Sequence, residues 1–414
     1  MMQKRLLSLL LITVAVLGIG LILSQRQQPV AETQAASGAL VPELASALND
    51  VSSIRISKAK DELIAHLKRG ENGWTVANRH DYPANIGKIR EYLIKLSEAK
   101  VREAKTSKPE NYARLGVEDL GAESATGLGV EVGGLKTPVK LIVGVSSGGG
   151  SPGTFVRRAA EAESFLVSGD VIPDKEGGNW LAREILSLPS AQVRAVAVTA
   201  PDKSVLKIEK SDASQVNYSV SGIPKGRQLS SESVGNLTAA VLDGLTLEDV
   251  LPAADASPDA ASTWSATYAG YDGHVVDVTL WDSDGKSWAK FAARVDEAAV
   301  DAWVAAEKAK ADAARATAQA EAAAKSAAAE DTTADAAQPK PESGAATETV
   351  ADSVPAAAIP EPFDADKARA EKLAELEKRV AELNARTSPW AYAIPTWKAA
   401  NIKKKMDDLL QPKS

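Results

Sequence analysis

An apolar stretch opens the chain, running from Leu6 to Leu23 without a charged residue and interrupted only by the polar side chains of Ser8 and Thr13. At about 1.5 Å per residue, a helix of this length nearly spans a hydrocarbon core about 30 Å thick. Lys4 and Arg5 come directly before the stretch, and basic residues are sparse after it. The positive-inside rule therefore places the N-terminus in the cytoplasm. The pattern predicts a transmembrane anchor over residues 1–24, with the rest of the chain outside the cytoplasm.

A cleaved signal peptide is the alternative interpretation of this stretch. The apolar region of a signal peptide is normally about 7 to 15 residues long and ends at an Ala-x-Ala site. Here the run is longer, and the nearest such site, Ala45-Ser46-Ala47, lies far downstream. An uncleaved anchor is therefore favoured, and both interpretations export the module. Residues 25–44, which are polar and rich in small side chains, are predicted to form a linker.

Two stretches of alternating apolar and polar residues, Val51 to Ser57 and Val193 to Thr199, have the same register. Alternation of this kind predicts half-buried strands. Each is followed by two further strand patterns and by apolar residues at helical spacing. In the first copy these are His66 to Lys68, Trp74 to Val76, and a helix bearing Ile86, Ile89, Leu93 and Leu96; in the second they are Lys207 to Glu209, Tyr218 to Val220, and a helix bearing Val234, Leu237 and Val241.

Both copies then continue in alternating segments separated by turn residues, which predicts antiparallel meanders. Asp284-Gly285 is a hairpin signal. The predicted fold class is therefore α+β, with two similar β-β-β-α plus meander halves over residues 45–190 and 191–295. Between them, residues 179–188 have helical apolar spacing that stops at Pro189.

The remaining residues change in composition. Residues 296–330 are rich in alanine and charged helix formers, which predicts a solvated helix. Residues 331–362 carry hardly any core-forming side chains and predict a disordered linker. Residues 363–414 predict a helix, a strand and a short terminal helix. The apolar stripe of that first helix covers about two heptads, short of a full coiled coil, and needs a partner surface.

Composition narrows the classes of partner and chemistry. The 414 residues carry a net charge of −7 with a pI near 5.3 and no basic cluster with interleaved aromatic residues, which argues against nucleic acid. The chain has no cysteine. It therefore has no disulfide, no thiolate nucleophile, no cysteine-ligated metal and no acylated cysteine.

One sequence matches a hydrolase motif. Gly144-Val145-Ser146-Ser147-Gly148 fits the Gly-x-Ser-x-Gly nucleophile elbow, but the elbow requires a helix next, whereas a run of glycines follows here. A flexible hairpin loop explains the motif better. The same glycine run has no Gly-Lys-Ser/Thr element that would indicate a phosphate cradle.

Histidine spacing predicts no metal site. His66, His80 and His274 are the only histidines, and none stands at the short spacing of a zinc motif. The His80-Asp81 pair is interpreted as loop. No catalytic, cofactor-binding or metal-binding residue is assigned, and no cofactor is expected.

Three tryptophans fall in the second meander. Trp264, Trp281 and Trp288 either line a glycan or peptide groove or pack in the core, and core packing is favoured because small sheets usually bury their aromatic residues. The basic run Lys403 to Lys405, which Asp407 and Asp408 follow, is interpreted as a solvated helix face.

An ordered set of short motifs resembles the domain-of-unknown-function family DUF4340. The motifs are Gly73-Trp74-Thr75-Val76, Tyr82-Pro83-Ala84-Asn85, Tyr112-Ala113-Arg114-Leu115-Gly116-Val117, Leu141-Ile142-Val143-Gly144, Phe155-Val156-Arg157 and Trp180-Leu181-Ala182-Arg183. The resemblance covers residues 45–295 and the final strand. This sequence departs from the family pattern at Asn85, where Asp is more usual, and in the Ala-rich insertion. It implies a membrane-anchored extracytoplasmic protein, considered alongside gliding-motility-type ABC transport components, without established catalytic residues.

The predicted anchor, the two similar halves and the lack of an assigned catalytic, cofactor or metal site together predict a non-enzymatic accessory or binding subunit of an envelope ABC-type transport assembly. The expected location is the inner membrane, with a single pass and the bulk in the periplasm or extracytoplasmic space. Expected partners are the membrane and proteins of a transport complex, and no nucleic acid. A stand-alone envelope module that binds glycan or peptide is the alternative, and a hydrolase that uses Ser146 is a distant third.

Overall fold

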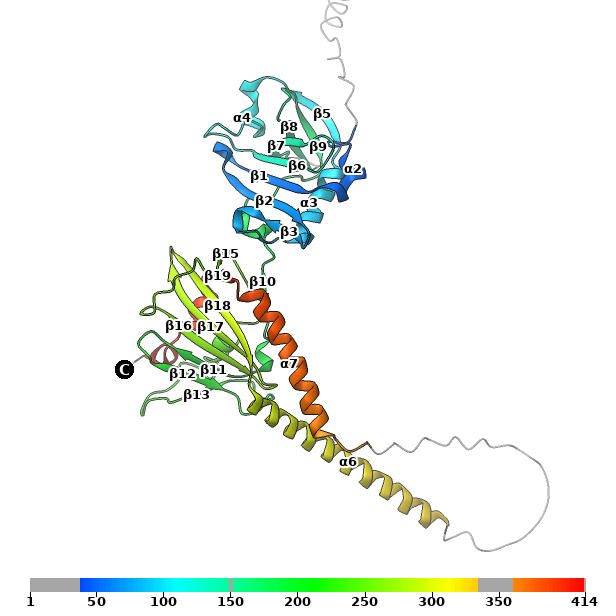
Figure 1. Ribbon diagram of the computed structural model, residues 1–414, viewed down its shortest axis with the longest axis vertical. Coiled ribbons are helices and arrows are strands. Elements are labelled where there is room, and N and C mark those ends of the chain that lie inside the picture. Colours follow the sequence, from blue (N-terminus) through cyan, green and yellow to red (C-terminus); the bar gives the residue numbers. More distant parts are fainter. Residues whose placement is uncertain (1–37, 149–151, 334–359, 413–414) are drawn as a thin grey trace, which may run out of the picture. The chain divides into compact units, whose positions relative to one another are not determined.

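The computed structural model describes residues 38–148, 152–333 and 360–412, which form two compact units divided between Arg183 and Glu184 (Figure 1). Each unit is built on one large antiparallel sheet. The predicted anchor over residues 1–24 lies outside the described residues. Within the described ranges, no helix combines the length and apolar character needed to cross a bilayer. The fold is therefore mixed α and β, with antiparallel sheets and several helices.

The first unit contains a nine-stranded sheet in the order β4-β3-β2-β1-β6-β7-β8-β9-β5. Its strands are β1 (Ser53–Ser57), β2 (Leu63–Gly70), β3 (Gly73–Val76), β4 (Tyr82–Pro83), β5 (Val101–Thr106), β6 (Leu128–Gly133), β7 (Val139–Ser146), β8 (Gly153–Arg158) and β9 (Ser164–Ser168). Its α-helices are α2 (Leu44–Ala47), α3 (Ile86–Glu98) and α4 (Tyr112–Leu115).

Strand β1 shows how sequence alternation sets the core of this sheet. Ile54 and Ile56 are fully buried, whereas Arg55 between them is exposed. Opposite them on β6 stand two buried valines, Val132 and Val130. Because side chains on a strand alternate between the faces, this register places the apolar set of both strands in the core.

The second unit contains an eight-stranded sheet in the order β13-β12-β11-β16-β17-β18-β19-β15, and a separate β10-β14 pair. Its strands are β10 (Glu184–Leu186), β11 (Val193–Thr199), β12 (Val205–Glu209), β13 (Ser219–Ser221), β14 (Leu245–Thr246), β15 (Asp249–Pro252), β16 (Trp264–Gly270), β17 (His274–Ser283), β18 (Lys286–Val295) and β19 (Trp390–Ile394). Its helices are α5 (Asn236–Ala239), α6 (Glu297–Thr333), α7 (Ala365–Thr387), α8 (Thr396–Ile402) and α9 (Met406–Leu409).

The C-terminal helices and strand belong to this second unit. Strand β19 pairs with both β18 and β15 and so completes the sheet. Leu376 of α7 packs with Val300 and Val304 of α6, and Asn384 of α7 bonds the main chain of Ala293 on β18. Helix α7 thus obtains the partner surface that its apolar stripe requires. The predicted disordered linker over 331–362 lies mostly outside the described residues.

Residues 179–188 are not the helix that their spacing predicts. A 3-10 turn, Gly177–Trp180, is followed by the short strand β10. Trp180 and Leu181 are buried in the first unit, whereas Ile185 and Leu188 are buried in the second. The helical spacing of these four residues therefore arises because two are buried in each unit, and they do not share one face of a helix.

The predicted helix of the second copy is also different. Only α5 is helical there, and Leu237 is exposed instead of buried. Gly235 and Gly244 flank the segment, Gly244 with a left-handed φ of 54°, and glycine has a low intrinsic helix propensity. The chain forms successive turns in its place.

The unit boundaries differ from the predicted ones at both ends. Leu40, Val41 and Leu44 are buried, so core residues of the first unit already occur within the predicted linker 25–44. The first unit ends at Arg183 instead of residue 190, and the second includes the C-terminal segment. The hairpin at Asp284-Gly285 is confirmed, with φ values of 51° and 73°, as a two-residue primed turn requires.

Candidate docking groove beside helix α3

Two motifs that lie far apart in the sequence meet at the start of α3. The amide of Asn85 donates to the carbonyl of Trp180 at 2.8 Å, and the amide of Ala182 donates to the carbonyl of Pro83 at 2.8 Å. The Asn85 side chain also caps α3, accepting from the amide of Lys88 at 3.0 Å. The 171–183 segment is therefore held along the N-terminal end of this helix.

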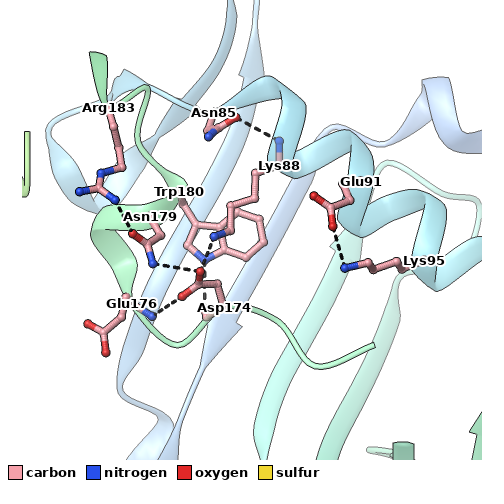
Figure 2. Close-up of polar contacts among 9 residues, drawn as sticks. All are labelled: Asn85, Lys88, Glu91, Lys95, Asp174, Glu176, Asn179, Trp180 and Arg183. Carbon is pink, nitrogen blue, oxygen red and sulfur yellow. Dashed lines mark hydrogen bonds and ion pairs between the residues drawn. The ribbon is translucent and has the colours of Figure 1, made fainter. Parts of the chain in front are cut away.

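Polar contacts fasten the 171–183 segment to α3 (Figure 2). Lys88 on α3 forms an ion pair with Asp174 and lies over the ring of Trp180, 5.4 Å from its centroid. The other oxygen contacts of Asp174 are the side-chain amide of Asn179 at 3.0 Å and the main-chain amide of Glu176 at 2.8 Å. Figure 2 shows these groups converging on one carboxylate, so each is engaged in holding the segment.

Asp174 is ionised in this arrangement. Partial burial opposes ionisation, but the hydrogen bonds from Lys88, Glu176 and Asn179 outweigh it and lower the pKa of Asp174 below its ordinary value. Three donors, from Lys88, Glu176 and Asn179, engage the carboxylate. Its role is structural.

Trp180 and Tyr92 complete this contact in the core. The two rings meet edge to face, with centroids 5.7 Å apart and planes at 78°, a favourable aromatic geometry. Burial raises the pKa of Tyr92, whose hydroxyl donates to the carbonyl of Val171 at 3.3 Å. The flank of α3 that faces the 171–183 segment is therefore fully occupied.

The other flank of α3 is open. A groove of about 470 Å³ lies there, and we call it the α3 groove. Its apolar lining consists of Leu48, Trp74, Ile86, Ile89, Leu93 and Ile94, and Arg69 and Arg90 also contribute to it. Ile86 is 51% exposed and Ile94 is 40% exposed. Residues spaced by four share one side of a helix, so Ile86, Arg90 and Ile94 form one ridge beside the groove.

A second group of the sequence motifs surrounds Arg157 in the same unit. The buried guanidinium of Arg157 donates to the carbonyl of Val117 at 2.9 Å and to that of Glu161 at 3.1 Å, and it pairs with Asp119. It also lies 4.6 Å from the centroid of the Tyr112 ring. These residues therefore support the packing of α4 and its following loop against the sheet.

The Gly-x-Ser-x-Gly motif does not form a nucleophile elbow. Strand β7 runs through Ser146, whose hydroxyl donates to the carbonyl of Gly153 at 3.3 Å, and the next described element is strand β8. Gly144 is required by packing, because a Cβ there would lie 2.0 Å from the carbonyl oxygen of Leu115. The motif belongs to a hairpin.

The three histidines stand on separate elements. His66 lies on β2 and His274 on β17, and His80 and Asp81 form a left-handed turn with φ values of 57° and 55°. In the part of the chain that the structure describes, no group of three or more His, Asp or Glu side chains is placed to hold a metal ion.

The tryptophans of the second meander and the lysine run both have contacts within the second unit. Trp281 and Trp288 face each other across β17 and β18 and are buried with Ala391 and Ala393, so core packing is confirmed for both. In the lysine run, Lys403 pairs with Asp282, and Lys405 pairs with Asp202 at 2.6 Å. These lysines are neutralised within their own unit.

The sequence patterns did not reveal the α3 groove. Its only sequence signal is the spacing of Ile86, Arg90 and Ile94, and the prediction placed Ile86 on the buried face. The helix begins at Ile86 itself. The side that is buried was set by the docking of the 171–183 segment, of which residues 179–183 belong to the helix predicted over 179–188.

The geometry defines a module of antiparallel sheets whose polar clusters hold the fold. The family model for the domain of unknown function DUF4340 matches residues 74–263. No curated protein matches the chain. No solved structure matches it.

Proposed function

We propose that this chain is a non-catalytic accessory or binding subunit of an envelope ABC-type transport assembly, anchored by its N-terminal helix with its bulk outside the cytoplasm. The α3 groove is the surface by which it docks a protein partner. The observation that carries this proposal is the exposure of Ile86 and Ile94 on a helix whose opposite flank is fixed by the 171–183 segment.

Energetics favour a protein partner for the α3 groove. Removing apolar side chains from water contributes about 25 cal/mol per Å², and a rigid helix loses little conformational entropy on binding. Arg69 and Arg90 contribute to the groove, so the complementary surface is an apolar segment flanked by acidic residues. A groove of this composition fits a segment of another subunit.

The absence of catalysis is part of this proposal. It is supported by the bonding of the polar groups around Asp174 and Arg157, which all hold main-chain segments in place. Burial of Trp281 and Trp288 removes two of the three tryptophans that motivated the alternative of a glycan or peptide groove, whereas Trp264 is half-buried. A protein-docking role is the simpler account.

The two units are proposed to be copies of one module. In support, their strand orders correspond: β3-β2-β1-β6-β7-β8-β9-β5 in the first unit and β13-β12-β11-β16-β17-β18-β19-β15 in the second. In each, the strand that precedes the meander in sequence closes the far edge of the sheet. The first unit keeps a long helix, α3, where the second has only α5. The docking groove is thus a property of the first unit alone.

Site-specific photocrosslinking tests the docking proposal. A photoreactive residue at position 94 in the full chain, expressed in its native envelope, is expected to cross-link a permease or ATPase subunit of an ABC-type assembly. The matched control places the same residue at Val216, an exposed apolar position of the second unit. The Ile86→Gln/Ile94→Gln variant should fold normally and lose the assembly in a detergent pull-down.

Three outcomes would count against the proposal. They are equal cross-linking from positions 94 and 216, a pull-down without permease or ATPase, or retention of the assembly by the double Gln variant. Fractionation of the full chain with the cytosol would separately refute the anchored location. A hydrolase activity that is lost in Ser146→Ala would refute the absence of catalysis.

A further inference from the structure

A small pocket of the second unit lies between helix α7, the start of β17 and the residues after β10. Its volume is about 170 Å³, and its walls include His274, Arg379, Glu382 and Arg386. Pockets for organic ligands usually measure about 300 Å³ or more. This pocket therefore has room for a small ion or a single functional group.

His274 is the unusual side chain of this pocket. It is only 6% exposed, and neither ring nitrogen has a hydrogen-bond partner among the described residues. Buried polar groups are almost always hydrogen-bonded. A neutral imidazole offers one donor and one acceptor, and an imidazolium offers two donors. The ring thus has unused bonding capacity at the pocket wall.

Two arginines of α7 face the same pocket. Arg379 and Arg386 are two helical turns apart and so lie on one side of the helix. Arg386 donates from one terminal nitrogen to the carbonyl of Ile185 at 3.0 Å, and Arg379 contacts Asp272 at 3.4 Å and Glu375 at 3.8 Å. Since a guanidinium has five N–H donors, both keep donors for a ligand.

We propose that this pocket binds a small oxyanion, with the guanidinium groups of Arg379 and Arg386 and a ring N–H of His274 as donors. Its lining carries two guanidinium groups and one carboxylate, that of Glu382, while Asp272 and Glu375 contact Arg379 from outside the lining. The excess of cationic groups in the lining disfavours a cation. Guanidinium forks and oxyanions match in geometry, and charge-assisted hydrogen bonds of this type are the strong ones.

The protonation state of His274 makes oxyanion binding depend on pH. Burial lowers the pKa of His274; Arg379 and Lys372 act in the same direction, and Asp272 acts against them. Glu382 and Arg386 also face the pocket, and Glu375 holds Arg379. A bound oxyanion favours the imidazolium and so raises this pKa. By linkage, the anion binds more tightly as the pH falls.

Nuclear magnetic resonance of the histidine rings tests this inference on the full-length protein in detergent. The chain has three histidines, and His66→Gln and His80→Gln identify the signal of His274. Sodium sulfate is the probe because its charge is constant across the histidine range of about pH 5 to 8. Sodium chloride at equal ionic strength is the control, and separate phosphate and acetate titrations compare tetrahedral anions with carboxylates.

The expected result is a saturable sulfate-dependent shift of the His274 signal, a raised His274 pKa and tighter binding at lower pH. Arg379→Gln/Arg386→Gln should weaken sulfate binding about tenfold or more, because it removes two charge-assisted donors. Lys378→Gln, at an exposed position of the same helix outside the pocket, should not weaken it.

The inference is overturned if sulfate shifts the His274 signal no more than chloride does. The pocket would then hold only water and would not be an anion site. It is also overturned if the folded double variant binds sulfate as the wild type does. Circular dichroism establishes whether that variant folds. If it does not, the wild-type titration against chloride decides the question alone.

Discussion

The Nε atom of Arg157 donates to the carbonyl oxygen of Val117 across 2.9 Å, inside the core of the first unit. The same guanidinium covers the Tyr112 ring and donates to the carbonyl of Glu161. A positively charged side chain is thus buried as the partner of main-chain oxygens. Its removal leaves these oxygens without donors.

Arg157→Met is therefore expected to lower the unfolding free energy of the first unit by about 2 to 4 kcal/mol, since two buried carbonyl acceptors lose their donor. Hydrogen exchange in β6 to β8, measured by mass spectrometry, reports this change. Arg102→Met, at an exposed position, is the control and should change stability by about 0.5 kcal/mol or less. Equal effects of the two variants would contradict the structural role of Arg157.

The two glycines of the Gly-x-Ser-x-Gly motif should respond differently to alanine. A Cβ at Gly144 would lie 2.0 Å from the carbonyl oxygen of Leu115, whereas a Cβ at Gly148 meets nothing within 4 Å. Gly144→Ala is expected to cost about 1 to 3 kcal/mol, as overpacking usually does, and Gly148→Ala should be close to neutral. Thermal unfolding of both variants measures the difference. A more harmful substitution at Gly148 would show that the loop itself has a role.

Asp174 is expected to stabilise the 171–183 segment in a pH-dependent manner. Its folded-state pKa lies below the ordinary value of 3.8. The contribution is therefore complete above that value and is lost as the pH falls through the folded pKa. At neutral pH, Asp174→Asn should cost about 1 to 2 kcal/mol, since hydrogen bonds to a charged group are lost.

Urea unfolding at neutral pH and at a pH below the folded pKa of Asp174 tests that expectation. The difference between wild type and Asp174→Asn should shrink at the acidic pH, because both side chains are then neutral. Asp170→Asn is a neighbouring control outside the ion pair with Lys88. A difference that stays constant across the pH range would exclude the ionised carboxylate as the stabilising group.

Lys398 of α8 is a buried cation held by main-chain oxygens. Its ammonium group donates to the carbonyls of Val241 and Asp243, each at 2.7 Å. Lys398→Met should lower the unfolding free energy of the second unit by about 1 to 3 kcal/mol, because it leaves these acceptors unsatisfied. Lys404→Met, in the following loop, is the comparison.

The same lysine predicts an alkaline effect. Burial lowers the pKa of Lys398 below its ordinary value of 10.5, and Asp243 opposes the shift only in part. The folded protein therefore loses this proton at a lower pH than the unfolded chain does. The unfolding free energy of the wild type, relative to Lys398→Met, should rise as the pH rises from the folded pKa toward 10.5. A fall over that range would contradict a depressed pKa.

Most strands and the hairpin at Asp284-Gly285 could be predicted from sequence, because alternation and turn chemistry are local properties. Gly235 and Gly244 are a local signal that the second helix is short, which the apolar spacing of Val234, Leu237 and Val241 does not reveal. The docking groove and the His274 pocket had no comparable local signal. Each is made of residues from elements that are separate in the sequence.

The sequence by itself determined the periodicity of the sheets, the Ala-rich helix and the motifs that resemble the DUF4340 family, because each depends on neighbouring residues. Only the tertiary structure decided that Trp180 and Ile185 serve different units, that α3 has one occupied and one open flank, and that His274 faces two arginines. The physical reason is that burial and pairing are set by which distant segments meet. Side-chain spacing along the chain does not record that.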